Sequence, residues 1–200
     1  RTICVLAKRR GSVWSRKKPR ENSMHENMES KNIMGKKEVT LLDRSKVLVR
    51  LMQAEDAAAV AQIEAQLFSR PWSEQSFQSM SVRPETLFVV VQSEESIIGY
   101  CGLMLVQGEG DITNVAVSAY MQGRGIGESM LQVAMEWAEK KGVKEFTLEV
   151  RVSNTPAIAL YKKLGFETEG IRRNFYEEPM EDALIMWKRQ EVDGTFTTSF

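Results

Sequence analysis

A glycine-rich turn, Gln122-Gly123-Arg124-Gly125-Ile126-Gly127, lies between the apolar run Val115-Ala116-Val117 and an amphipathic stretch from about Arg124 to Lys141. A strand that breaks into glycines at the first turn of a helix presents several N–H groups without carbonyl partners. These groups lie at the positive end of the helix dipole, which suits a pyrophosphate. The glycine turn therefore predicts a phosphorylated cofactor, and the alternative is a glycine-rich turn with no ligand.

The spacing of this turn excludes two common phosphate loops. A P-loop requires a lysine directly after its last glycine, whereas Glu128 and Ser129 follow Gly127 here. A dinucleotide-binding turn spaces its glycines G-x-G-x-x-G, whereas Gly123, Gly125 and Gly127 follow G-x-G-x-G. Nucleotide hydrolysis and dinucleotide redox chemistry are therefore disfavoured.

Composition indicates one soluble domain with its own core. The 200 residues are 42% apolar, and no segment reaches the roughly 18 consecutive apolar residues that a membrane span requires. Two cysteines, Cys4 and Cys101, form neither a disulfide framework nor a zinc site, so we expect a cytoplasmic protein and an inert, buried Cys101. The single histidine is His25, so we expect no histidine-based triad and no metal site in the domain.

A formal net charge of zero hides two different segments. Residues 1–20 contain eight Lys or Arg and no acid, which leaves 19 basic against 27 acidic residues in the rest of the chain. We expect residues 1–46 to be a mobile basic extension: a transit peptide, a nucleic-acid arm or added sequence. The folded domain is expected over residues 47–190, and a short tail over 191–200.

Hydrophobic periodicity from Val47 onward predicts a mixed α/β domain. The expected order is strand, two helices, three strands, a long helix, a strand, a helix and two strands. Short turns make most neighbouring strands antiparallel, while the long helical crossover makes the strands near 111–117 and 144–151 parallel. The fold class is thus a mixed, mostly antiparallel sheet with helices on its faces, and a ligand site at the ends of those two strands.

Three polar residues after the glycine turn are candidates for chemistry. Strand alternation places Glu149 on the face opposite Phe146, Leu148 and Val150, so its carboxylate can point into a cleft beside the cofactor. The alternative for Glu149 is a solvent-facing partner of a neighbouring arginine, Arg151. Two more side chains, Asn154 and Tyr161, are about two helical turns apart and can face the same cleft, although Tyr161 also fits a core aromatic with its hydroxyl at the rim.

Several segments together resemble the GNAT acetyltransferases, and within them the RimI type, the ribosomal-protein-alanine N-acetyltransferases. The resemblance runs from about Val47 to Lys188. Its most specific part is L-E-V-R-x-S-N-x-x-A-I-x-L-Y from Leu148 to Tyr161, followed by E-D-A-L-I-M from Glu181 to Met186. The glycine turn, Pro71-Trp72-Ser73 and Arg172-Arg173-Asn174 also match.

The resemblance implies a GNAT fold with acetyl-CoA as the acetyl donor. The strand before the turn would pair its backbone with the pantetheine amides, the glycines would bind the pyrophosphate, and Arg124 could add charge. A backbone N–H beside Val115 would polarise the thioester carbonyl. The implied cofactor-binding residues are Val115, Ala116, Val117, Gln122, Gly123, Arg124, Gly125, Ile126, Gly127, Glu128 and Asn154.

The resemblance also implies direct transfer to the α-amine of a protein N-terminus, with Glu149 as base, through water, and Tyr161 as acid. The implied acceptor is a basic ribosomal protein with an N-terminal alanine. Four acids near the last loop, Glu177, Glu178, Glu181 and Asp182, would attract it unless they are simply solvated.

Two other functions remain open at this point: a small-molecule amine acetyltransferase, and a non-catalytic acetyl-CoA-binding module. We expect no membrane partner, and nucleic acid only through the basic extension. The RimI pattern commonly carries two tyrosines after Arg-Asn. Phe175 replaces the first of them here, so this position offers no hydroxyl to the peptide.

Overall fold

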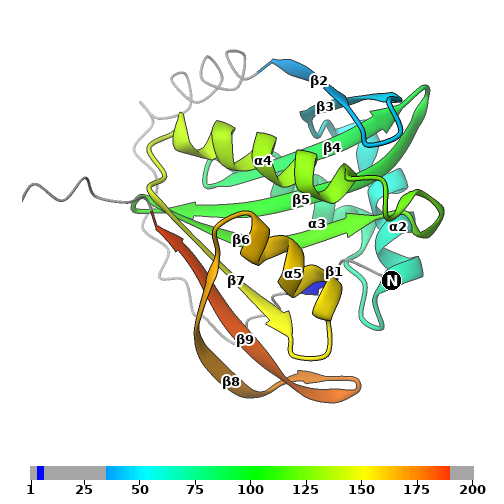
Figure 1. Ribbon diagram of the computed structural model, residues 1–200. Coiled ribbons are helices and arrows are strands. Elements are labelled where there is room, and N and C mark those ends of the chain that lie inside the picture. Colours follow the sequence, from blue (N-terminus) through cyan, green and yellow to red (C-terminus); the bar gives the residue numbers. More distant parts are fainter. Residues whose placement is uncertain (1–3, 7–34, 190–200) are drawn as a thin grey trace, which may run out of the picture.

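One mixed sheet organises residues 4–6 and 35–189, which are the residues that the computed structural model describes (Figure 1). Its strand order is β2-β3-β4-β5-β6-β7-β9-β8, with β1 also paired to β6. All pairs are antiparallel except the predicted parallel pair β6–β7. The strands are β1 (Cys4–Leu6), β2 (Lys36–Thr40), β3 (Lys46–Leu51), β4 (Thr86–Ser93), β5 (Ser96–Val106), β6 (Glu109–Val117), β7 (Glu145–Arg151), β8 (Glu167–Glu177) and β9 (Met180–Arg189).

Helices cover both faces of the sheet, as the periodicity predicts (Figure 1). The helices are α2 (Ala57–Leu67), α3 (Glu74–Ser81), α4 (Ile126–Glu139) and α5 (Thr155–Lys163), with short 3-10 turns at Ala54–Asp56 and Ala119–Met121. Side chains cap two of these helices: Ser73 Oγ accepts from Ser76 N at 3.2 Å, and Asn154 Oδ1 accepts from Ala157 N at 3.3 Å. Side-chain capping of this kind satisfies N–H groups that the first helical turn leaves unpaired.

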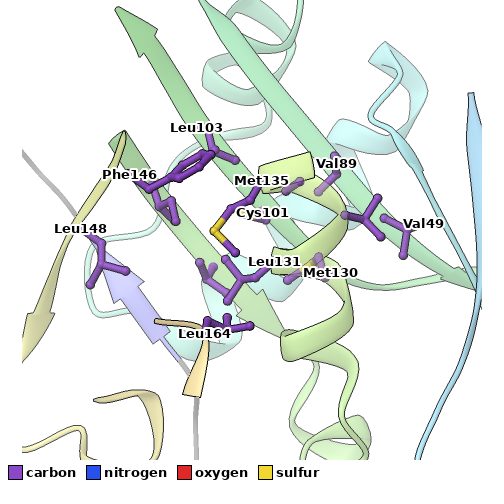
Figure 2. Close-up of a cluster of buried hydrophobic side chains, with 14 of the residues drawn as sticks. Val49, Val89, Cys101, Leu103, Met130, Leu131, Met135, Phe146, Leu148 and Leu164 are labelled. Atoms are coloured by element: carbon purple, nitrogen blue, oxygen red, sulfur yellow. The ribbon is translucent and has the colours of Figure 1, made fainter. Parts of the chain in front are cut away.

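Strand alternation divides the core into two layers. The larger layer packs α4 and α5 on one sheet face, and Figure 2 shows Leu131 and Met135 of α4 beside Cys101 from β5. The smaller layer packs α2 and α3 on the opposite face. Because Leu148 and Val150 belong to the larger layer, Glu149 between them points to the α2/α3 face.

A buried ion pair fixes the start of α2 against β3. Arg50 donates to both carboxylate oxygens of Asp56, at 2.6 and 2.8 Å, and Gln53 N donates to the same carboxylate at 2.8 Å. Burial tends to raise the pKa of Asp56, but the hydrogen bonds from Arg50 and Gln53 outweigh it, so the pKa lies below its usual 3.8. The charge of Asp56 is therefore retained across the neutral range.

The sheet begins earlier in the chain than the expected boundary at residue 47. Strand β2 pairs with β3 from Lys36 opposite Arg50 to Thr40 opposite Lys46, and Leu41 belongs to the core at 5% exposure. The expectation of an extension up to residue 46 was wrong for this part, because β2 is a charged, exposed edge strand without apolar alternation. The rest of the extension (1–3 and 7–34, including His25) and the tail 190–200 lie outside the described residues.

The last hairpin is long and irregular. Strand β8 continues to Glu177, and β9 begins at Met180. Most of β8 is exposed, and its pairing with β9 shifts register twice, once between Thr168 and Gly170 and once between Arg172 and Tyr176. Bulges of this kind break the two-residue period on which strand prediction depends.

Candidate active site

The glycine turn has the backbone conformation that its sequence predicts. Gly123 and Gly125 have φ of +78° and +85°, in the left-handed region that side-chain-bearing residues avoid. Gly125 is the N-cap of α4, which begins at Ile126, so the free N–H groups of the first helical turn follow at once. A Cβ at Gly125 would lie 3.1 Å from Leu42 Cγ, whereas one at Gly123 would meet no heavy atom within 4 Å.

The turn between β2 and β3 supports the glycine turn from outside. Arg124 Nε donates to Asp43 Oδ2 at 2.7 Å, Arg124 Nη2 lies 3.3 Å from Ser45 Oγ, and Leu42 N donates to Arg124 O at 3.3 Å. Hydrogen bonds from Ser45 first, and then from Arg124, lower the pKa of Asp43 to about 2. Sequence analysis missed Asp43 because it lies in the segment assigned to the extension, 81 residues from Arg124.

The other predicted residues of this turn also have partners within the chain. Gln122 Nε2 donates to Val117 O at 2.9 Å, which fixes the chain between β6 and the turn. Glu128 accepts from Lys163 Nζ at 2.7 Å, which ties α4 to α5. The oxygen of Asn154 serves as the helix cap, so this side chain holds the start of α5 next to the end of β7.

The edge of β6 next to the glycine turn accepts an extended backbone. Strands β6 and β7 pair only over Glu109–Asp111 and Glu145–Thr147. Beyond this point β1 takes the place of β7, with Val5 opposite Val115 and Cys4 opposite Ala116. The edge predicted to bind the pantetheine arm can thus pair with an added strand, and residues 4–6 of the chain lie there in this structure.

A buried amide next to this edge is also unsatisfied. Asn114 is fully buried on β6, and neither Nδ2 nor Oδ1 has a hydrogen-bond partner among the residues that the structure describes. Leaving a buried polar group unpaired costs about 1–3 kcal/mol. The position favours a polar ligand between β6 and β7, and sequence analysis assigned Asn114 no role.

Glu149 is buried and ion-paired across the sheet. Its side chain is 6% exposed, and Oε1 lies 2.9 Å from Nη1 of Arg172 on β8. The alternative of a solvent-facing residue paired with Arg151 was wrong, because Arg151 instead binds Glu181 at 2.9 Å. Tyr176 donates its hydroxyl proton to the backbone oxygen of Glu149 at 3.1 Å, which fixes β8 to the strand that carries the candidate base.

Tyr161 belongs to the larger core layer, on the face opposite Glu149. It is fully buried, and its ring meets Phe166 edge-on at 5.8 Å between centroids. The same layer contains Val115 and Val117 from the strand edge and Ile126 from the glycine turn. The two candidate catalytic residues therefore lie on opposite faces of the sheet, near the ends of β6 and β7 that do not pair with each other.

Each acid of the predicted acidic loop has an arginine partner. Arg70, after α2, binds both Glu177 and Glu178, and Ser69 Oγ donates to Glu178 O at 3.2 Å. Glu181 pairs with Arg151, and Asp182 pairs with Arg173 at 2.6 Å. These pairs join the α2–α3 connection to the β8–β9 turn and largely compensate the negative charge that was expected to attract a basic peptide.

Other sites receive no support in the described part of the chain. Cys101 is fully buried, which raises the pKa of its thiol and makes it inert, as expected. Over residues 4–6 and 35–189, no three His, Cys, Asp or Glu side chains are arranged to hold a metal ion. In the same ranges, no helix is both long and apolar enough to cross a membrane.

The segment that contains the glycine turn and the β6 edge also matches a known protein family. The sequence profile of the Acetyltransferase (GNAT) family matches residues 57–166. The chain belongs to the GNAT acetyltransferase family. It is therefore an enzyme, an acetyl-CoA-dependent N-acetyltransferase, and its mixed sheet has the GNAT fold that the resemblance implied.

Relatives within the GNAT family place the chain near one branch. It is 40% identical over 145 residues to a candidate ribosomal protein bS18-alanine N-acetyltransferase of Bacillus subtilis, covering 72% of this chain and 96% of the relative. The crystal structure of the Escherichia coli ribosomal-protein-S18-alanine N-acetyltransferase superposes with a TM-score of 0.68 at 32% identity, covering 77% and 99%. The PaiA N-acetyltransferase of Thermoplasma acidophilum, solved in complex with coenzyme A, shares the fold with a TM-score of 0.61 at 21% identity, covering 72% and 99%.

Proposed function

We propose that this GNAT enzyme acetylates the α-amine of a protein N-terminus, and that its acceptor is ribosomal protein bS18 with an N-terminal alanine. The observation that carries the proposal is a buried carboxylate, Glu149, at the end of β7, in a chain whose relatives are named for this activity. The match spans 92–99% of these relatives' own lengths, so the activity belongs to the part of the chain that is shared.

The residues present fit acetyl-CoA, which supplies the acetyl group as a thioester. The first turn of α4 offers N–H groups to phosphates, and Gly123 and Gly125 allow close approach of the backbone. The edge of β6 at Val115 and Ala116 offers backbone pairing to an amide-containing arm, as it does to β1. The Asn114 amide, which has no partner among residues 4–6 and 35–189, offers one further donor and acceptor at that edge.

Glu149 would act as the proton acceptor. An α-amine has a pKa of about 8, so near pH 7 only a small fraction of the acceptor is nucleophilic, and a placed carboxylate has one proton to remove. Glu149 is shielded from solvent, and Tyr176 anchors its backbone, so the carboxylate has a fixed direction. No covalent enzyme intermediate is required for this chemistry.

Tyr161 would act as the proton donor to the departing thiolate. Its hydroxyl lies in the layer that contains Val115 and Val117, which is the side of the sheet opposite the base. Separate faces suit separate roles, because the acceptor would approach from the α2/α3 face while the thiolate leaves from the other. The thiolate, with a reference pKa near 8.5, needs only modest assistance.

The test is acetyl transfer to defined acceptors. The purified chain is incubated with labelled acetyl-CoA and three peptides that differ only in starting with Ala, Ser or Met, alongside intact bS18. Mass spectrometry then locates the acetyl group. We expect modification of the α-amine, greatest with Ala and bS18, and none on the same peptides blocked at the N-terminus.

Two results would contradict the proposal. Modification only of lysine side chains or of small amines such as polyamines would show a different acceptor class. Binding of acetyl-CoA without transfer to any acceptor in the panel would indicate a non-catalytic module.

A further inference from the structure

The ion pair between Glu149 and Arg172 places a cation directly on the candidate base. Glu149 Oε1 and Arg172 Nη1 are 2.9 Å apart, which is ordinary contact for a charged pair. The two partners differ in solvent access: the Glu149 side chain is 6% exposed, whereas the Arg172 side chain is 43% exposed. Arg172 can therefore leave the carboxylate for water, but Glu149 cannot.

The bulge of β8 between Arg172 and Tyr176 holds Arg172 within reach of Glu149. Arg172 pairs with Ala183, but the next paired residue of β8 is Tyr176, opposite Glu181, so the strand carries two extra residues over this interval. Asn174 within the bulge has φ of +50°, and its N–H is fixed by Asp182 at 2.9 Å. The bulge thus gives Arg172 a defined position at the rim of the site.

A second contact for the Arg172 guanidinium, the ring of Phe175, lies within the same bulge. Arg172 Cζ is 5.2 Å from the centroid of the Phe175 ring, within the range of cation–π attraction. A guanidinium that leaves Glu149 would keep this contact and gain hydration. Phe175, which departs from the tyrosine common at this position in the RimI pattern, supplies that ring face.

We propose that the Arg172 guanidinium occupies the subsite of the acceptor's α-ammonium in the free enzyme, so that acceptor binding exchanges one cation for another at Glu149. The proposal rests on the proposed function, and it identifies Glu149 Oε1 as the atom that receives the ammonium. A buried carboxylate left without any cation is costly, so one partner replaces the other as the site fills.

The exchange also gives a physical reason for product release. Transfer forms the amide C–N bond and breaks the thioester C–S bond; of the two protons that the ammonium loses, one ends on the coenzyme A thiol and one reaches solvent through Glu149. The acetylated product has no charge at that nitrogen. Arg172 then forms its ion pair with Glu149 again, because no ammonium group competes for the carboxylate, and this pair disfavours rebinding of the product.

The test compares two ligands on matched variants. Arg172→Gln removes the competing cation, and Arg173→Gln removes the adjacent arginine, which is 78% exposed and pairs with Asp182. The ligands are an Ala-starting decapeptide with a free α-amine and the same peptide acetylated at its N-terminus. Dissociation constants are measured by calorimetry on the full chain, with coenzyme A present so that no transfer occurs.

We expect Arg172→Gln to bind the free-amine peptide about fivefold more tightly than the unmodified chain, because a competitor at a partly buried pair is gone. Binding of the acetylated peptide should change less than about twofold. Arg173→Gln should leave both constants within about twofold, and Arg172→Lys, which retains a cation, should lie between the unmodified chain and Arg172→Gln.

Equal changes for the two peptides, or weaker binding of the free amine to Arg172→Gln, would overturn the proposal. If Arg172→Gln fails to fold by circular dichroism, Arg172→Lys decides alone: no difference from the unmodified chain in the ratio of the two constants refutes the exchange. Failure of the proposed function gives a different result, since the unmodified chain would then not acetylate the peptide at all.

Discussion

Replacing Glu149 with glutamine is the sharpest test of the catalytic assignment. The amide keeps the size and shape of a side chain that is 6% exposed, but it cannot accept the proton of the α-ammonium. Removing a positioned base costs about 10²–10⁴ in rate, which is about 3–5 kcal/mol of transition-state stabilisation. We therefore expect kcat at pH 7 to fall by about that factor.

The same substitution should leave folding and donor binding almost intact. Arg172 loses its partner, but its side chain is 43% exposed and can be hydrated, so the free energy of unfolding should change by no more than about 1 kcal/mol. No residue of the glycine turn contacts Glu149 in the described hydrogen bonds and ion pairs, so the dissociation constant for coenzyme A should stay within about twofold. Calorimetry and thermal unfolding measure these two controls.

The pH dependence separates a lost base from a distorted site. Without Glu149 the reaction depends on acceptor molecules that are already deprotonated, so the rate of Glu149→Gln should rise about tenfold per pH unit and level off above pH 8. Tyr161→Phe is the comparison, because it should slow transfer without producing this rise. A Glu149→Gln enzyme within threefold of the unmodified chain from pH 6 to pH 9 would refute the role of Glu149.

Three other changes probe the rest of the site and its support. Gly125→Ala and Gly123→Ala should each cost about 1–2 kcal/mol of stability, because both positions have positive φ, and both should weaken coenzyme A binding. Adding Leu42→Ala to Gly125→Ala should recover only the part of the loss that comes from the Leu42 contact, because the backbone strain remains. Val5→Pro should strengthen coenzyme A binding several-fold in calorimetry, because proline weakens the β1 pairing that lies on the β6 edge; unchanged affinity would contradict a shared edge. Asp56→Asn should lower the free energy of unfolding by about 3 kcal/mol at pH 7, measured by urea unfolding. The difference should shrink below about pH 4. The pKa of Asp56 is lowered in the folded state, so its carboxylate stabilises the fold above the pKa of the unfolded state, and this stabilisation is lost as pH falls through the pKa of the folded state.

Local chemistry explains which parts of the site could be predicted from the sequence. The glycine turn, the start of α4 and the orientation of Glu149 depend on residues close together in the chain, and glycine conformation and strand alternation act at that range. The parallel β6–β7 pair was predictable because the helical crossover through α4 is long enough to bring the second strand back in the same direction.

Contacts between distant segments could not be predicted in the same way. Asp43 reaches Arg124 across 81 positions from a charged edge hairpin, and the alternation pattern contains no signal for such a strand. Arg172 follows the register shift between Thr168 and Gly170 of β8, which moves every later side chain relative to a regular strand, and from this position it reaches Glu149. The pairing of Arg151 with Glu181, rather than with Glu149, follows from the same hairpin geometry.

The internal pairing of the acidic loop changes the expected basis of acceptor selection. Acids that are already bound to Arg70, Arg151 and Arg173 present little net field to an approaching basic protein, and exposed pairs of this kind are further screened by salt. The partner of Glu149 is different, because a partly exposed arginine can give way to an incoming ammonium while the buried carboxylate stays. In the proposed exchange, selection by charge would be concentrated at one atom, Glu149 Oε1, beside the nitrogen that is acetylated.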